Sequence, residues 1–270
     1  MSEYNQTKRI LIVEDEHIVS IELKQLLNEM GFFQIDCTST GEGAVKLART
    51  QKPDLILMDI KLAEEMDGIS SAEEILSNQD IPVVYLTAYA DDETIERVKL
   101  THPYGYLLKP FKKHELKVCV EIALYKHQIS KKLSLQEKKY RTIFKESTVG
   151  FCLFNSKGIL EEINEAACKL LGITNQQDIA GFQIAADPNM GSLISESLST
   201  HRKKQITIKY DFDTIRKNDV YRTKHHGVHF FQIHIIPLPA ENAGMPEGVF
   251  VYILNITESQ HAEEKLEHEK

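Results

Sequence analysis

The feature that most constrains the fold of this chain is a series of short aliphatic runs, each of which ends in a polar side chain. The first run, Ile10–Val13, is followed directly by three carboxylates at 14–16. Runs that are apolar throughout are typical of strands buried on both faces of a parallel sheet. Similar runs occupy residues 33–38, 55–58, 83–86 and 104–108. Amphipathic stretches separate them, among them a predicted helix at 91–100, so residues 9–127 are predicted to form a doubly wound α/β domain with five parallel strands.

Four of these runs end in groups that can bind a metal ion or a phosphoryl group. The groups are Glu14 and Asp15, Asp59, Thr87 and Lys109. Because the carboxyl ends of parallel strands share one edge of the sheet, we expect these side chains to converge. Clustered carboxylates favour Mg²⁺, and one of them can act as a nucleophile towards phosphorus. A simpler interpretation, in which Asp15 only caps the next helix, would not explain the other three strand ends.

Residues 9–125 resemble the receiver domain of two-component response regulators. The resemblance is carried, in this order, by Glu14-Asp15, Asp59, Asp67-Gly68, Thr87-Ala88 and Gly105-Tyr106-x-x-Lys109-Pro110-Phe111. It implies a flavodoxin-like sheet with strand order 2-1-3-4-5 and a cis peptide bond before Pro110.

The resemblance also implies a role for each matching residue. Asp59 would be the phospho-accepting aspartate, and Thr87 and Lys109 would bind the phosphoryl group. Mg²⁺ would be held by Glu14, Asp15, Asp59 and the backbone carbonyl of Lys61. Tyr106 would be the aromatic switch that turns inward when Thr87 moves, although a half-buried strand aromatic is an alternative interpretation.

The loop after Asp59 departs from the family pattern. Ala63 stands where the family usually has proline, and Gly68 follows Asp59 by nine residues, one more than usual. Lys61 and Tyr89 lie two residues after Asp59 and Thr87, at positions that would border the path of an attacking water. We expect this pair to tune the hydrolysis of the aspartyl phosphate.

Residues 113–143 contain neither glycine nor proline and predict one long helix. Residues 128–143 lie beyond the reach of the receiver core, yet their apolar stripe continues. We therefore expect a parallel coiled coil in a homodimer at 128–143. The polar Gln136 within the stripe also suits a single solvated helix.

Residues 144–258 have a different pattern. Strands are predicted at 150–155 and 159–163, with Asn164 capping a helix that Gly172 ends. Three further runs follow at 205–212, 228–237 and 248–256, and the segment 213–226 could form a long hairpin. These elements predict an antiparallel five-stranded sheet with helices on one side. It resembles a PAS sensor domain through Tyr140-x-x-Ile143-Phe144, Gly150-Phe151, Asn164–Gly172 and Asn255-Ile256-Thr257-Glu258.

No cofactor motif marks this second domain. The sequence therefore identifies no ligand for it, and a domain without a ligand is an open alternative. Four histidines, at 225, 226, 229 and 234, invite a metal-site interpretation. However, His229 and His234 are an odd number of residues apart and should face opposite sides of one strand.

The flanking segments are expected to be a disordered N-terminus at 1–8 and the start of an output helix at 259–270.

Bulk composition excludes several classes of protein. The formal net charge of −8 argues against a nucleic-acid surface, and no apolar run suits membrane insertion. Four cysteines without a C-x-x-C pair favour a cytoplasmic protein. A haloacid-dehalogenase-type phosphatase would need a second aspartate where Lys61 stands.

Together these features predict a phosphorelay protein. Apart from the hydrolysis of its own aspartyl phosphate, the chain is not expected to be an enzyme. We expect its receiver to accept a phosphoryl group from a histidine kinase or phosphotransfer protein and to signal through the helix to the PAS domain. The alternative is the N-terminal part of a hybrid sensor histidine kinase.

Overall fold

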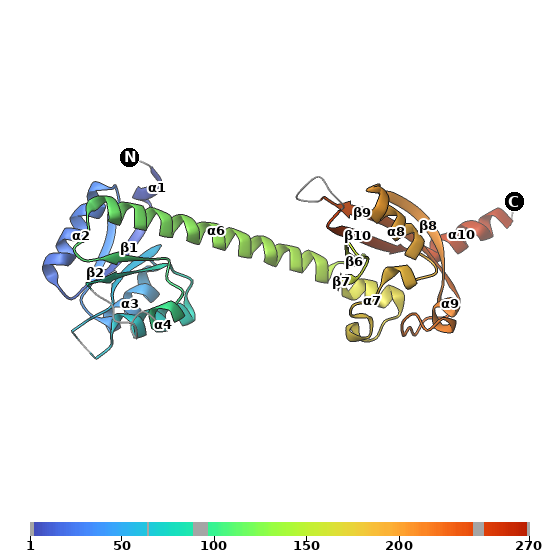
Figure 1. Ribbon diagram of the computed structural model, residues 1–270, viewed down its shortest axis with the longest axis horizontal. Coiled ribbons are helices and arrows are strands. Elements are labelled where there is room, and N and C mark those ends of the chain that lie inside the picture. The colour runs from blue at the N-terminus through green and yellow to red at the C-terminus, as the bar shows by residue number, and fades with distance from the viewer. Residues whose placement is uncertain (1–2, 64, 89–96, 240–245, 269–270) are drawn as a thin grey trace. The chain divides into compact units, whose positions relative to one another are not determined.

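The computed structural model describes residues 3–63, 65–88, 97–239 and 246–268 (Figure 1). The chain divides into two compact units, residues 1–135 and 136–270. The helix α6, Lys113–Glu146, spans the boundary between them as one continuous element. Within the described parts of the chain, no helix combines the length and apolar character that crossing a membrane requires.

The first unit is built on a five-stranded parallel sheet in the order β2-β1-β3-β4-β5, as predicted. Its strands are β1 (Arg9–Val13), β2 (Gln34–Thr38), β3 (Leu55–Asp59), β4 (Val83–Thr87) and β5 (Gly105–Leu108). Every residue of β3 and β4 is buried, which explains why these strands are apolar throughout rather than alternating. The sheet therefore has a core on each face.

Helices cover both faces of this sheet. They are α2 (His17–Glu29), α3 (Gly41–Gln51), α4 (Gly68–Asn78) and the first turns of α6. One core joins alternate strand residues to Leu23 and Leu27 of α2 and to Leu116 and Val120 of α6. The other core joins the remaining strand residues to α3 and α4. Burial of each such aliphatic side chain stabilises the fold by roughly 1.5–3 kcal/mol.

Two expectations for this unit need comment. The segment 1–8 was expected to be disordered, but residues 3–6 form α1, and Asn5 Nδ2 donates a hydrogen bond to the carbonyl of Met30 at 3.0 Å. The interaction crosses 25 residues of sequence, so no local pattern predicts it. Of the helix expected at 91–100, residues 97–100 are helical, and 91–96 lie outside the described residues.

The second unit contains an antiparallel five-stranded sheet in the order β7-β6-β10-β9-β8. Its strands are β6 (Gly150–Asn155), β7 (Leu160–Ile163), β8 (Lys204–Asp211), β9 (Val228–Leu238) and β10 (Gly248–Asn255). Its helices are α7 (Glu165–Leu171), η1 (Gln176–Ile179), η2 (Ile184–Ala186), α8 (Gly191–Thr200), α9 (Phe212–Lys217) and α10 (Thr257–His268). The predicted hairpin at 213–226 is wrong. The segment begins with α9, because Asp211 caps that helix by accepting from the amides of Asp213 and Thr214, and Phe212 and Ile215 enter the core.

Asn164 joins three elements of the second unit. Its Nδ2 donates to the carbonyls of Phe144 at 2.9 Å and Val149 at 2.8 Å. Its Oδ1 accepts from the amides of Phe151 at 2.8 Å and Ala167 at 2.9 Å. The side chain is buried and uses its full hydrogen-bonding capacity, so it is more than the helix cap that the sequence predicted.

Candidate functional site

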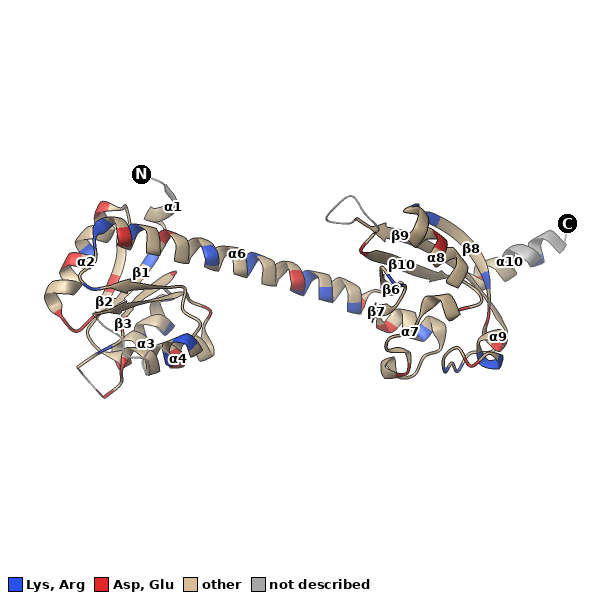
Figure 2. Cartoon of the chain, in the orientation of Figure 1, with Lys and Arg blue, Asp and Glu red and all other residues tan. Residues whose placement is uncertain are grey.

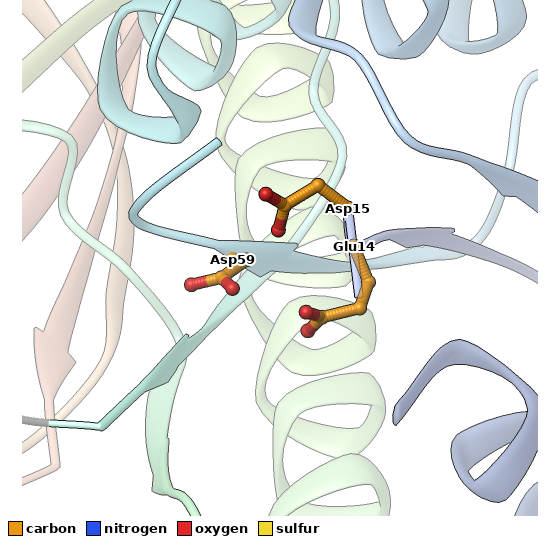
Figure 3. Close-up of side chains that lie close together, drawn as sticks. All are labelled: Glu14, Asp15 and Asp59. Atoms are coloured by element: carbon orange, nitrogen blue, oxygen red, sulfur yellow. The ribbon is translucent and has the colours of Figure 1, made fainter. Parts of the chain in front are cut away.

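Three carboxylates meet at the carboxyl edge of the parallel sheet (Figure 3). Glu14 and Asp15 follow β1, and Asp59 ends β3. These strands are neighbours in register, with Val13 opposite Met58, so their ends fall side by side. One carboxylate oxygen of each residue lies within 4.8 Å of the others. The sequence predicted this convergence correctly.

Glu14 and Asp59 are buried, whereas Asp15 is partly exposed. Burial raises the pKa of Glu14 to about 7, and repulsion from Asp59 adds to this effect against the lowering effect of Lys109. A carboxylate that is destabilised in this way needs a positive charge nearby.

Lys109 supplies that charge from the loop after β5. Its Nζ lies 2.6 Å from Asp59 Oδ2 and 2.8 Å from Glu14 Oε1. Burial acts to lower the pKa of Lys109, but hydrogen bonds to the two carboxylates outweigh it and hold the pKa above its usual value. The Lys109–Pro110 peptide bond is cis, as the resemblance implies.

Backbone amides complete the surroundings of the carboxylates. The amide of Lys61 donates to Asp59 Oδ1 at 3.2 Å, and the amide of Glu16 donates to Glu14 Oε1 at 3.3 Å. Glu14 Oε2 is buried without a hydrogen bond of good geometry, although Lys109 Nζ lies 2.7 Å away. Clustered carboxylate oxygens, one of them incompletely satisfied, fit a hard divalent cation such as Mg²⁺.

Two further predicted site residues lie on β4 and β5. Thr87 ends β4, where the preceding Leu86 is paired with Asp59, and it is buried. Tyr106, on β5, is 49% exposed and stacks on the buried Tyr85 with ring centroids 6.5 Å apart. Tyr89 lies outside the described residues.

Two features of the loop after Asp59 were not anticipated. A Cβ at Gly68 would lie 1.8 Å from the carbonyl oxygen of Asp59, so only glycine allows the loop to return so closely to β3. Asp67 caps α4 through the amide of Ser70 at 2.7 Å and forms an ion pair with Arg97 at 3.0 Å. The Asp-Gly pair was recognisable in the sequence, but its steric reason was not.

Of the four histidines named from the sequence, His225 and His229 lie close together, with ring centroids 5.1 Å apart, whereas His234 lies apart from them. His229 packs against Phe212 and Phe231 on the core side of β9, while His234 stacks on Tyr252 on the other side. The prediction that this pair faces opposite sides of the strand is confirmed. Burial, with a contribution from His225, lowers the pKa of His229.

Comparisons with known proteins agree with both halves of the sequence. Residues 10–121 match the family model of the response regulator receiver domain, and residues 138–201 match a PAS domain model. The transcriptional regulatory protein PdtaR of Mycobacterium tuberculosis strain H37Rv is 32% identical over 154 residues, which cover 57% of this chain and 73% of PdtaR.

Two solved structures are similar to the first unit. The signal receiver domain of a modulated diguanylate cyclase from Desulfovibrio desulfuricans G20 is 32% identical, with a TM-score of 0.44, covering 46% of this chain and 98% of that one. The receiver domain of sensor histidine kinase PA1611 from Pseudomonas aeruginosa PAO1, with magnesium coordinated in its active-site cleft, is 31% identical. That match covers 43% of this chain and 97% of the other, with a TM-score of 0.41.

Proposed function

Because the chain belongs to the response regulator family, with a receiver domain followed by a PAS domain, we propose that it accepts a phosphoryl group on Asp59. A receiver domain places the protein in phosphorelay signalling. The observation that carries the proposal is the contact of Lys109 with both Asp59 and Glu14, at 2.6 and 2.8 Å, from a third strand end. This arrangement combines a nucleophile, a countercharge and a second carboxylate.

The proposed donor is a phosphohistidine on a histidine kinase or phosphotransfer protein. A carboxylate oxygen of Asp59 attacks phosphorus, a P–O bond forms, and the P–N bond breaks. The departing imidazole keeps the bonding electron pair and takes up a proton. Lys109 balances the negative charge next to the nucleophile, and the Thr87 hydroxyl donates a hydrogen bond to a phosphoryl oxygen.

The carboxylates of Glu14, Asp15 and Asp59, with the backbone carbonyl of Lys61, are proposed to hold Mg²⁺. When bound, Mg²⁺ would supply positive charge to the phosphoryl oxygens. The buried, incompletely satisfied Oε2 of Glu14 supports this assignment. The aspartyl phosphate would later be lost to water, at a rate that Lys61 and Tyr89 tune.

We further propose that phosphorylation draws Thr87 towards Asp59 and lets Tyr106 turn inward from its half-exposed position. The altered surface would lie on β4 and β5 and beside the first turns of α6. Signals would then pass along α6 to the PAS domain, in a homodimer formed through this helix and the PAS domain. We place this exchange in the cytoplasm, with no nucleic-acid partner.

The decisive experiment is labelling with acetyl phosphate and Mg²⁺, with phosphorylated protein separated on a phosphate-affinity gel. The full chain should be labelled, and Asp59→Asn should not. Asp36→Asn is the matched control, since Asp36 lies on β2 of the same sheet but is separate from the cluster. Label that persists in Asp59→Asn would refute the assignment of the acceptor.

A further inference from the structure

The helix α6 carries an apolar row on the face opposite to the receiver core. Leu116, Val120 and Ala123 point into that core and are fully buried. The exposed row, which we call the seam, consists of Val118, Ile122, Tyr125, Ile129, Leu133, Tyr140 and Ile143. Its members are substantially exposed, from 38% at Val118 to 67% at Ile143. Apolar side chains repeated along one helix face indicate a packing partner.

The spacing of the seam is that of a coiled coil with one interruption. Including Gln136, its successive steps are four, three, four, four, three, four and three residues. Alternating threes and fours are the heptad positions a and d. The two consecutive fours, from Tyr125 through Ile129 to Leu133, amount to an insertion of four residues, which locally unwinds a coiled coil.

Charged side chains flank the seam in a pattern that selects the orientation of the partner. Glu121 and Lys132 directly precede Ile122 and Leu133, at a positions, and therefore occupy g positions. Lys126 and Glu137 directly follow Tyr125 and Gln136, at d positions, and therefore occupy e positions. Figure 2 shows acidic residues interspersed among the more numerous basic residues of α6. In a parallel, in-register pair of helices, a g residue faces the e residue five positions later on the other helix. Both such spacings here, 121 to 126 and 132 to 137, join opposite charges.

We propose that a second copy of this chain packs along the seam, parallel and in register. Glu121 would then face Lys126 of the partner subunit, and Lys132 would face Glu137 of the partner subunit. The inference rests on the homodimer of the proposed function and specifies its interface. The seam consists of two stretches, 118–129 and 133–143, separated by the unwound step.

Existing contacts on the helix do not prevent these pairs. Glu121 lies 4.0 Å from Lys117, and Glu137 lies 3.0 Å from Arg141, each within one turn of the same helix. All four side chains are at least half exposed, so these ion pairs are weak and can be shared with a second helix.

Charge reversal in the full chain tests the pairing through the dimer dissociation constant, measured by sedimentation. Glu121→Lys should weaken the dimer about two- to fivefold, and adding Lys126→Glu in the same chain should restore it to within about twofold. Lys131→Glu, on the opposite face, is the control and should have less than a twofold effect. Failure of the second change to restore affinity would overturn the pairing.

Cysteine crosslinking tests orientation and register. In a chain with Cys37→Ser and Cys119→Ser, Ile122→Cys and Ile143→Cys should each form a disulfide between identical positions of two chains. Ser134→Cys, beside Leu133 but on the opposite face, should not.

A monomeric chain, or a dimer that links at neither seam position, would overturn the inference. Labelling of Asp59 by acetyl phosphate does not depend on this seam. A failure of the proposed phosphorylation and a failure of the proposed dimer would therefore give different results.

Discussion

Lys109 Nζ lies 2.6 Å from Asp59 Oδ2, although the two residues are 50 positions apart in the sequence. The same ammonium group reaches Glu14, 95 positions away. Lys109 is 13% exposed at its side chain and Asp59 is 9% exposed, so their interaction is only weakly screened by water. The pair therefore places a protected positive charge beside the proposed nucleophile.

Removing that charge should slow phosphorylation. We expect Lys109→Ala to reduce the rate of labelling by acetyl phosphate by about 100-fold, the scale seen when one charge-stabilising donor is lost from a reaction site. Time courses at fixed donor and Mg²⁺ concentration measure this rate. Lys112→Ala, an exposed lysine three residues on, should keep the wild-type rate. An unchanged rate in Lys109→Ala would exclude the proposed role.

Asp15 should contribute to magnesium affinity. We expect Asp15→Asn to weaken Mg²⁺ binding by about tenfold or more, equivalent to roughly 1.4 kcal/mol, because an anionic ligand is lost. Isothermal titration calorimetry on the full chain measures the dissociation constant directly. The neighbouring exposed carboxylate provides the comparison, and Glu16→Gln should bind Mg²⁺ like the wild type. Equal affinities for all three proteins would remove Asp15 from the site.

Gly68 should be intolerant of any side chain. In Gly68→Ala the new Cβ would meet the carbonyl oxygen of Asp59 at 1.8 Å, so the loop or the end of β3 must shift. We expect a loss of about 2–4 kcal/mol of unfolding free energy in urea titrations, together with slower labelling of Asp59. Ser77→Ala, at the exposed end of the same helix, should change stability by less than about 0.5 kcal/mol.

Asn164 should tolerate neither alanine nor aspartate. Asn164→Ala loses four hydrogen bonds and should cost about 2–4 kcal/mol of unfolding free energy. Asn164→Asp keeps the two acceptor bonds but cannot donate to the carbonyls of Phe144 and Val149, so it should also be destabilising. At Asn175, which only accepts from the amide of Gln177, the change to aspartate should be nearly neutral. Near-neutral Asn164→Asp would show that its donor bonds contribute little.

The buried Asp187 should make the stability of the second unit depend on pH. Burial raises its pKa, against the lowering effect of hydrogen bonds from Tyr210, Asn189 and Met190. The native state therefore holds this proton more tightly than the unfolded state, whose pKa is near 3.8. Stability from this group is fully present below 3.8 and is lost as pH rises through the native pKa.

Asp187→Asn removes this titration and keeps a side-chain oxygen that accepts hydrogen bonds. The variant should therefore gain unfolding free energy relative to wild type as pH rises from below 4 to 7, measured by urea titration at each pH. Asp178→Asn, at an exposed position, should show a difference that stays constant with pH. A constant difference for Asp187→Asn as well would contradict the assignment.

The elements of the chain were predictable where burial imposes a local pattern. The strands β3 and β4 are apolar at every interior position because both faces of the sheet are covered. Asn164 and Gly172 mark the two ends of α7, because capping depends on a few neighbouring residues. By contrast, α1 and α9 are shorter than the window over which periodicity can be recognised, and both were missed.

The sequence alone determined which chemical groups stand at the ends of the parallel strands, since each follows directly from its own apolar run. It also predicted a site for phosphoryl transfer, because three carboxylates, a hydroxyl and an ammonium at one sheet edge suit that chemistry. Only the tertiary structure decided that Lys109 contacts both Glu14 and Asp59, that burial raises the pKa of Glu14, and that Gly68 must lack a side chain. Those properties depend on distances between segments far apart in the chain, which strand order and packing set and which local pattern does not encode.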